Sequence, residues 1–125
     1  MQINVLLSIK PKFAAAIFSG DKKFEFRKTI FKNQKIKKAY VYASSPVGLV
    51  IGEFEIEEVI TSNPDSLWDE TMEKAGISKE YFDNYFFGRE VGYALKVGAT
   101  NFYEEPKTLM EMFNIKRPPQ SFMYI

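Results

Sequence analysis

Near its start the chain contains the stretch Gly20-Asp21-Lys22-Lys23-Phe24-Glu25-Phe26-Arg27, whose pattern predicts a turn followed by a short strand. A glycine at the head of the stretch suits the end of a preceding helix, because glycine adopts left-handed backbone angles without strain. Side chains along a strand alternate between its two faces. Phe24 and Phe26 therefore share one face, and we predict that this aromatic face is buried.

The opposite face of the same strand carries charges of both signs, from Lys23, Glu25 and Arg27, with Lys22 in the turn before it. A carboxylate two residues from a guanidinium on a rigid strand forms a compact polar group that suits ligand binding or acid–base chemistry. The alternative is a solvent-facing strand with one ordinary ion pair, which is common in antiparallel sheets. The spacing alone leaves both interpretations open.

Composition limits the chemistry that this chain can perform. Its 125 residues, 46% of them hydrophobic, predict a single folded domain over residues 1–125. The sequence contains no cysteine and no histidine, which excludes disulfides, thiolate catalysis and imidazole bases or ligands. Any catalysis must use Lys, Glu, Asp, Tyr, Ser or Thr. We predict neither a cofactor nor a bound metal.

The charges are divided unevenly along the chain. Residues 1–45 carry ten basic and two acidic side chains, whereas residues 46–125 carry seven basic and fourteen acidic ones. A basic half suits an anionic partner such as a phosphate backbone. Mutual attraction between the two halves explains the same asymmetry, and the sequence does not separate these explanations.

Neither a membrane span nor a secretory signal is predicted. No apolar run approaches the ~20 residues that cross a bilayer, and Met1–Ser8 is too short and lacks a basic start. We therefore expect a cytoplasmic protein without membrane contact.

The remaining pattern predicts five to six strands and several short helices. The expected strands cover residues 5–9, 23–28, 39–43, 49–60, 90–103 and 121–125, and the expected helices cover residues 11–19, 63–76, 78–88 and 109–113. We expect Gly52 to mark a bulge or a close backbone approach, and Pro106 to end the fifth strand. Most connections are short, which argues against parallel βαβ units. The fold class is α+β or mostly β, a small barrel with helices after the first strand and between the two long strands.

Two further features suggest nucleic acid. Residues 28–38 contain five lysines and no acid, so they suit either a solvated loop or a phosphate-contacting patch. Aromatic side chains stack on unpaired bases. The candidates for stacking are Phe31, Tyr42 and Trp68, although a core position is the more ordinary place for the single tryptophan.

Gly20, Lys22, Glu25 and Arg27 match the signature G-x-K-x-x-E-x-R, and the chain therefore resembles the ASCH domains of the PUA-like superfamily. Four more segments extend this likeness. In sequence order they resemble the subgroup described as predicted transcriptional regulators with a PUA-like domain: Leu7–Pro11, Tyr42–Pro46, Gly52–Phe54 and Pro118–Phe122. The resemblance implies a PUA-like β-barrel with a cleft lined by the signature side chains, and RNA or a modified nucleotide as ligand. The nucleic-acid-binding residues that it suggests are Lys22, Lys23, Glu25, Arg27, Lys28, Tyr42, Ser44 and Ser45.

Some relatives implied by this resemblance are enzymes, either ribonucleases or N4-acetylcytidine amidohydrolases. If this chain is an enzyme, Lys22 and Glu25 are the expected catalytic residues. The amidohydrolases have threonine where this chain has Glu25, and an acid close to Ala75, where the nearest acid here is Glu73. This departure counts against amidohydrolase activity.

Three functions consequently remain open from the sequence. The first is an RNA- or modified-nucleotide-binding domain in transcriptional or translational regulation. The second is a small hydrolase acting on RNA or a modified nucleoside. The third is an interaction module without chemistry, in which the charged group is an ion pair that holds the fold together.

Overall fold

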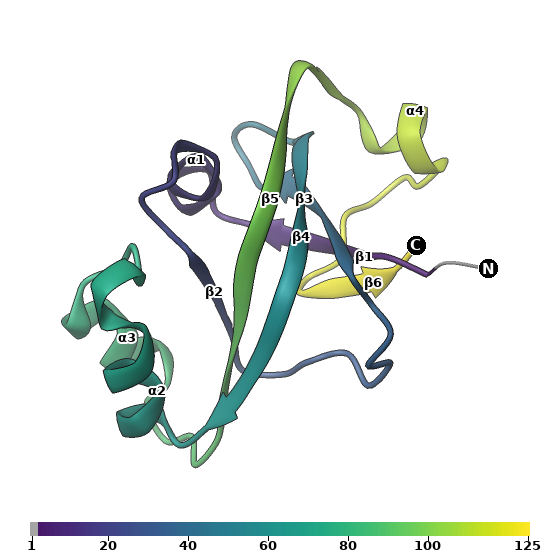
Figure 1. Cartoon of the computed structure of the whole chain (residues 1–125). Coiled ribbons are helices and arrows are strands. Elements are labelled where there is room, and N and C mark those ends of the chain that lie inside the picture. Colours follow the sequence, from purple (N-terminus) through teal and green to yellow (C-terminus); the bar gives the residue numbers. More distant parts are fainter. Residues whose placement is uncertain (1–2) are drawn as a thin grey trace.

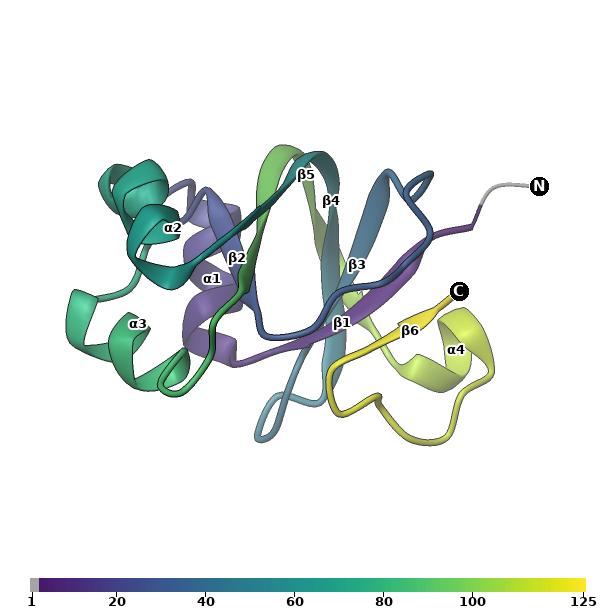
Figure 2. The same ribbon diagram turned by 90° about the horizontal axis from the view of Figure 1, so that it is seen from below.

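A computed structural model describes residues 3–125. Within these residues a six-stranded sheet curls into a half-barrel, with helices at both ends (Figures 1 and 2). The strands are β1 (Val5–Ile9), β2 (Phe24–Arg27), β3 (Lys38–Ala43), β4 (Leu49–Ser62), β5 (Gly92–Lys107) and β6 (Phe122–Tyr124). The helices are α1 (Pro11–Ser19), α2 (Pro64–Thr71), the 3₁₀ turn η1 (Met72–Lys74), α3 (Lys79–Tyr85) and α4 (Leu109–Phe113). The predicted class, α+β or mostly β with a small barrel of five to six strands, is confirmed, with the sheet forming a curled half-barrel.

The strands follow the order β2-β5-β4-β3-β1-β6, so β2 and β6 form the two edges of the sheet. The long strands β4 and β5 pair along most of their length and form the centre of the curl (Figure 1). The prediction against parallel pairing is wrong at one place, because β1 and β3 run parallel. The chain between them contains α1, β2 and residues 28–37, which is long enough for the crossover that parallel strands require.

A second prediction also fails, since β5 does not end before Pro106 but continues to Lys107. Val50 pairs with Lys107, whereas Gly52 pairs with Phe102, so β5 has three more residues than β4 in this interval. Pro106 lies in the resulting bulge, where its missing N–H breaks no ladder hydrogen bond. Gly52 itself allows a close approach, as expected, since a Cβ there would lie 2.5 Å from the Phe18 ring.

The helices begin and end where local chemistry predicts. Asn63, Ser78 and Thr108 accept hydrogen bonds from the first turns of α2, α3 and α4, which pairs amide groups that would otherwise lack partners. Gly20 ends α1 with φ of 91°, a left-handed conformation that glycine adopts freely. These caps set the directions in which the chain enters and leaves the sheet.

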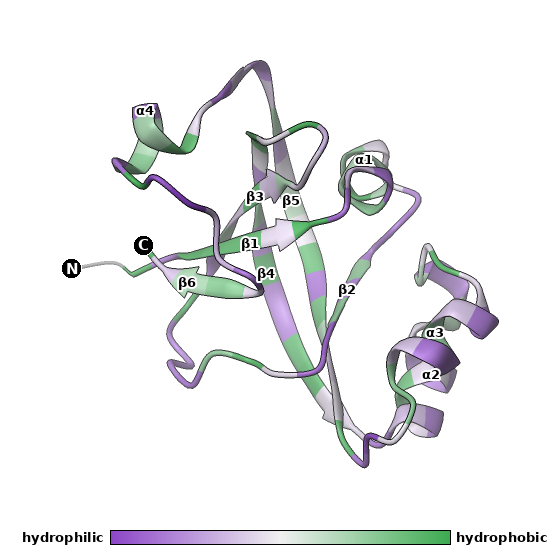
Figure 3. Cartoon of the chain, turned by 180° about the vertical axis from the view of Figure 1, so that it is seen from behind, coloured by the Kyte–Doolittle hydropathy of each residue, from purple (hydrophilic) through white to green (hydrophobic). Residues whose placement is uncertain are grey.

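Apolar side chains form three clusters around the sheet. The largest lies inside the curl and joins β1, β3, β4 and β5 to α1. A second packs β2 and β5 against α2 and α3, and a third lies between the sheet and α4. Figure 3 shows hydrophobic and hydrophilic colours alternating along the long strands β4 and β5, and both colours on α2 and α3. No helix within residues 3–125 combines the length and apolar character needed to span a bilayer.

Candidate functional site

Lys22 is the most deeply buried charged side chain of the signature, with 1% of its surface exposed. Its Nζ donates to the Ala75 carbonyl oxygen at 2.8 Å and lies 4.8 Å from the Phe26 ring centroid and 5.4 Å from that of Phe13. Burial lowers the pKa of Lys22 from 10.5 to about 8, and the negative charge of Glu25 opposes this shift. At neutral pH the ammonium is therefore held largely by a carbonyl and by ring faces.

Gly76 makes the burial of Lys22 possible. A Cβ on Gly76 would collide with the Cβ and Cγ of Lys22, at a separation that no pair of side-chain carbons tolerates. Its φ of 70° also belongs to the left-handed region that disfavours other residues. A backbone hydrogen bond also joins the two segments, since the Lys23 amide donates to the Lys74 carbonyl at 2.9 Å. The segment between α2 and α3 is thus fitted closely onto the turn that precedes β2.

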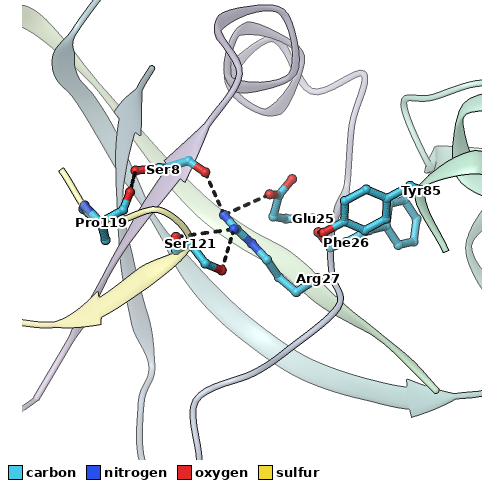
Figure 4. A network of polar contacts seen from close by, with 7 residues as sticks. All are labelled: Ser8, Glu25, Phe26, Arg27, Tyr85, Pro119 and Ser121. Atoms are coloured by element: carbon cyan, nitrogen blue, oxygen red, sulfur yellow. Dashed lines mark hydrogen bonds and ion pairs between the residues drawn. The ribbon is translucent and has the colours of Figure 1, made fainter. Parts of the chain in front are cut away.

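Arg27 and Glu25 lie on the face of β2 that points into the curl, and each is 7% exposed. Arg27 Nη2 lies 3.2 Å from Glu25 Oε2 and donates to the Ser8 carbonyl at 3.1 Å. Its Nη1 donates to the backbone carbonyl and hydroxyl oxygens of Ser121 (Figure 4). One guanidinium therefore connects the edge strand β2 to β1 and to the segment before β6, at the opposite edge of the sheet. The predicted ion pair exists, but it is buried and not solvent-facing.

These side chains surround a pocket of about 490 Å³ between the sheet and α3. This volume lies within the range of small-molecule and cofactor sites. The pocket is lined by four basic residues and one acidic residue, namely Lys10, Lys22, Arg27, Lys28 and Glu25. All of them come from the basic half of the sequence. The acidic half contributes only uncharged residues to the lining. The uneven charge of the sequence therefore gives this pocket an excess of positive charge.

Different elements supply the polar and aromatic sides of this pocket. Arg27 on β2, Ser8 on β1 and Ser121 just before β6 contribute polar groups from the sheet side, and Tyr81 and Tyr85 contribute rings from α3. The two tyrosines are one helical turn apart and consequently share a face of α3. The pocket thus combines hydrogen-bonding groups with an aromatic wall.

Each tyrosine of the wall also contacts a lysine. Lys10 Nζ lies 3.2 Å from the Tyr81 hydroxyl and 5.5 Å from its ring centroid, and Lys28 Nζ lies 4.7 Å from the centroid of Tyr85. The Tyr85 hydroxyl donates to the Phe26 carbonyl at 3.3 Å. Burial raises the pKa of Tyr85, and the charge of Arg27 partly offsets this effect, so its hydroxyl is neutral at physiological pH.

The structure brings five of the predicted site residues to the pocket: Lys22, Glu25, Arg27, Lys28 and Ser44. The residues Lys23, Tyr42 and Ser45 do not line it. Lys23 and Ser45 are exposed elsewhere, and Tyr42 is buried in the third apolar cluster. The reason is strand alternation: Val41 and Ala43 point into the curl, so Tyr42 points to the other face.

The other aromatic residues considered for base stacking pack against the protein itself and do not line the pocket. Phe31 is 5% exposed in the main core, and Trp68 packs on Phe82 with centroids 5.0 Å apart. The aromatic wall formed by Tyr81 and Tyr85 was missed by sequence reasoning, which placed both within the helix predicted over residues 78–88 but gave them no role in the site. Their spacing of four residues was visible, but the surface that this helix face covers depends on tertiary packing.

The acid expected in an amidohydrolase has no counterpart at the pocket. Ala75 provides only its backbone carbonyl to Lys22, and Glu73 is exposed and does not line the pocket. Within residues 3–125 there is also no cluster of three acidic side chains that could hold a metal ion. The chemistry available in the pocket is therefore that of a lysine, a carboxylate, a guanidinium and hydroxyl groups.

Comparison with known proteins identifies the class. Residues 7–105 match the ASCH domain model, and the chain belongs to the ASCH domain family. The "ASCH domain-containing ribonuclease" of Zymomonas mobilis is 30% identical over 125 residues, covering 98% of this chain and 84% of that protein. The crystal structure of ASCH from Zymomonas mobilis superimposes with a TM-score of 0.88 at 29% identity, covering 98% of this chain and 87% of the other.

Similar sequences also occur inside longer proteins. The large ribosomal subunit protein uL22 of Ureaplasma parvum is 33% identical over 123 residues, which are 98% of this chain but 39% of that protein. This chain therefore spans well under half of that relative. The N-terminal domain of Staphylothermus marinus McrB shares the fold, with a TM-score of 0.53 at 14% identity over 90% of this chain and 80% of the other.

Proposed function

We propose that this ASCH domain binds single-stranded RNA or a modified nucleotide in the pocket around Lys22, Glu25 and Arg27. The observation that carries the proposal is the lining of the pocket, where four cations face one carboxylate beside an aromatic wall. Phosphate groups supply charge for the cations, and an unpaired base supplies a planar surface and hydrogen-bonding edges. Glu25 would accept from an exocyclic amine of the base.

An unpaired hydrogen-bond donor of Arg27 supports the proposal that this pocket binds a ligand. Its Nε–H is buried without an acceptor among residues 3–125, although the other nitrogens of the guanidinium are paired. Buried donors in native proteins usually have partners, so an exception calls for an explanation. A ligand that shifts this side chain slightly would satisfy the remaining donor. The unpaired Nε–H of Arg27 would thus strengthen ligand binding.

The biological setting that we propose is cytoplasmic regulation of transcription or translation. The segment of uL22 that resembles this chain supports a connection with translation, since uL22 is a ribosomal protein. RNA is the partner that the pocket chemistry favours.

Salt titration of RNA binding tests the proposal. A fluorescent oligouridine of about ten nucleotides should bind more weakly as salt rises from about 50 to about 200 mM, since bound phosphates release counterions. Lys28 is an exposed lysine at the pocket. Lys28→Gln should make the negative slope of log affinity against log salt less steep by about 0.7. Lys37→Gln is the matched control, because Lys37 is exposed and does not line the pocket. Equal effects of both variants, or no binding at low salt, would refute the proposal.

A second candidate function is RNA hydrolysis, favoured by the lowered pKa of Lys22 and by the ribonuclease name of the similar Zymomonas protein. Neutral Lys22 would accept the proton of a 2′-hydroxyl while the 2′-oxygen bonds to phosphorus and the bond to the 5′-oxygen breaks. Water would then protonate the departing 5′-oxygen. We rank this function second because Lys22 is 1% exposed, so substrate reaches its Nζ only after the surrounding rings move.

A further inference from the structure

We infer that the pocket accepts one unpaired nucleotide at a time, with its base against Tyr81 and Tyr85 and its flanking phosphates at Lys10 and Lys28. This inference rests on the proposed RNA-binding function and names the form of RNA that the site takes. It assigns a ligand-contacting role to α3, a helix outside the signature stretch.

The first observation is the position of the aromatic wall. Tyr81 and Tyr85 line the pocket opposite the polar groups of Ser8, Arg27 and Ser121 (Figure 4 shows Tyr85 and the polar network). A nucleobase needs such an arrangement, because its faces are apolar and its edges form hydrogen bonds. Both tyrosines are only partly buried, so ring surface remains available to a ligand.

The second observation is the placement of the two lysines. Lys10 lies against Tyr81, and Lys28 lies against Tyr85, so the ammonium groups are associated with opposite ends of the aromatic wall. Both lysines are exposed and line the pocket. A ring face restrains a lysine before the ligand arrives, which lowers the entropy lost on binding. Phosphates on either side of an inserted base would meet these two positions.

The third observation concerns the support of α3. The segment before it is fixed to the sheet by the contact between Lys22 and the Ala75 carbonyl. Phe82 and Phe86, on the neighbouring face of α3, are buried in the second apolar cluster and pack on Phe26. The aromatic wall is therefore carried by a helix whose other side is anchored, and it is prepared for stacking before a ligand binds.

A base inside a duplex cannot enter this arrangement without leaving its stack, which is energetically unfavourable. The inference accordingly specifies single-stranded RNA or a flipped nucleotide, and stacking makes the recognition tolerant of base identity. The polar side of the pocket then adjusts the preference among bases.

The test compares oligouridine with an abasic oligomer of the same length, which has the same phosphates but no bases. We expect wild-type protein to bind the abasic oligomer about tenfold more weakly, in keeping with the known strength of base–aromatic stacking. Tyr85→Leu should weaken oligouridine binding and reduce this ratio, whereas Tyr85→Phe should preserve it. Tyr40→Leu is the matched control, since Tyr40 also lies beneath a lysine, Lys38, but does not line the pocket.

The outcomes separate this inference from the proposed function. If wild-type protein binds both oligomers equally and with the same salt dependence, base stacking is overturned while phosphate-based RNA binding stands. If Tyr85→Phe loses as much discrimination as Tyr85→Leu, the hydroxyl bond to Phe26 and not the ring carries the effect, and the inference is also overturned. Absence of binding to either oligomer at low salt removes the proposed function and this inference together.

Discussion

Arg27 on the edge strand β2 is joined to Ser8 on β1, the strand next to the opposite edge of the sheet, with Arg27 Nη2 donating to the Ser8 carbonyl at 3.1 Å. The same nitrogen contacts Glu25, and Nη1 reaches Ser121. The buried guanidinium of Arg27 thus connects β2 and β1, two strands that are not neighbours in the sheet. This connection has two consequences. It stabilises the curl of the sheet, and it fixes one side of the pocket.

The first prediction concerns this buried ion pair. Arg27→Leu should lower the free energy of unfolding by about 3 to 5 kcal/mol, because it leaves the Glu25 carboxylate buried without its partner. The double variant Arg27→Leu/Glu25→Leu should recover much of the loss, since neither member of this ion pair is left buried without its partner. Urea denaturation of the three proteins measures both effects. A double variant that is no more stable than the single one would show that the lost interstrand bonds dominate.

The second prediction concerns Gly76. Gly76→Ala should destabilise the protein for two reasons, namely its left-handed backbone and the collision with Lys22. Gly88→Ala is the matched control, because Gly88 has φ of 77° but an added Cβ there would meet nothing within 4 Å. Gly88→Ala should cost about 1 kcal/mol and Gly76→Ala clearly more. Equal losses in thermal or urea unfolding would mean that the collision is relieved without cost.

The third prediction concerns the pH dependence of stability. The pKa of Lys22 is about 8 in the folded protein against 10.5 as its ordinary value. The unfolded chain therefore binds more protons than the folded one between these values, so the free energy of unfolding should rise with pH in this window. Above about pH 10 the raised pKa of Tyr85 acts in the opposite direction, since the unfolded tyrosine ionises first.

Lys22→Met provides the comparison for this effect. It preserves most of the buried aliphatic chain and removes the titrating group, so its stability should lack the rise above about pH 8. At about pH 7 its stability should stay close to that of the wild type, because the removal of a desolvated charge offsets the loss of the hydrogen bond to the Ala75 carbonyl. Urea midpoints from about pH 7 to about pH 10 measure the difference. Parallel profiles for the two proteins would contradict the lowered pKa.

The fourth prediction belongs to the second candidate function. If Lys22 acts as the base in RNA cleavage, the rate should rise with pH and level off above about 8, where the amine is neutral. Lys22→Met should abolish cleavage while its folded signal by circular dichroism is retained. Cleavage of labelled RNA by both proteins, purified in parallel, gives the answer. A rate that persists in Lys22→Met would exclude Lys22 as the base.

Much of the local structure could be predicted without coordinates. The bounds of β1, α1 and α4 agree with the sequence pattern, because each depends on neighbouring residues such as the Thr108 cap. The continuation of β5 past Pro106 could not be predicted in this way. It depends on the register with β4, where a bulge accommodates the proline. The parallel pairing of β1 with β3 likewise depends on the path of the whole crossover.

By itself the sequence determined the alternation in residues 23–27, the helix caps, the uneven charge and the absence of imidazole and thiol chemistry. These properties follow from residue type and near neighbours. Only the tertiary structure decided that Lys22 meets Ala75, 53 residues away, and that Arg27 meets Ser121, 94 residues away. Such contacts arise from the curl of the sheet and the packing of α3, since long-range packing determines which surfaces face one another.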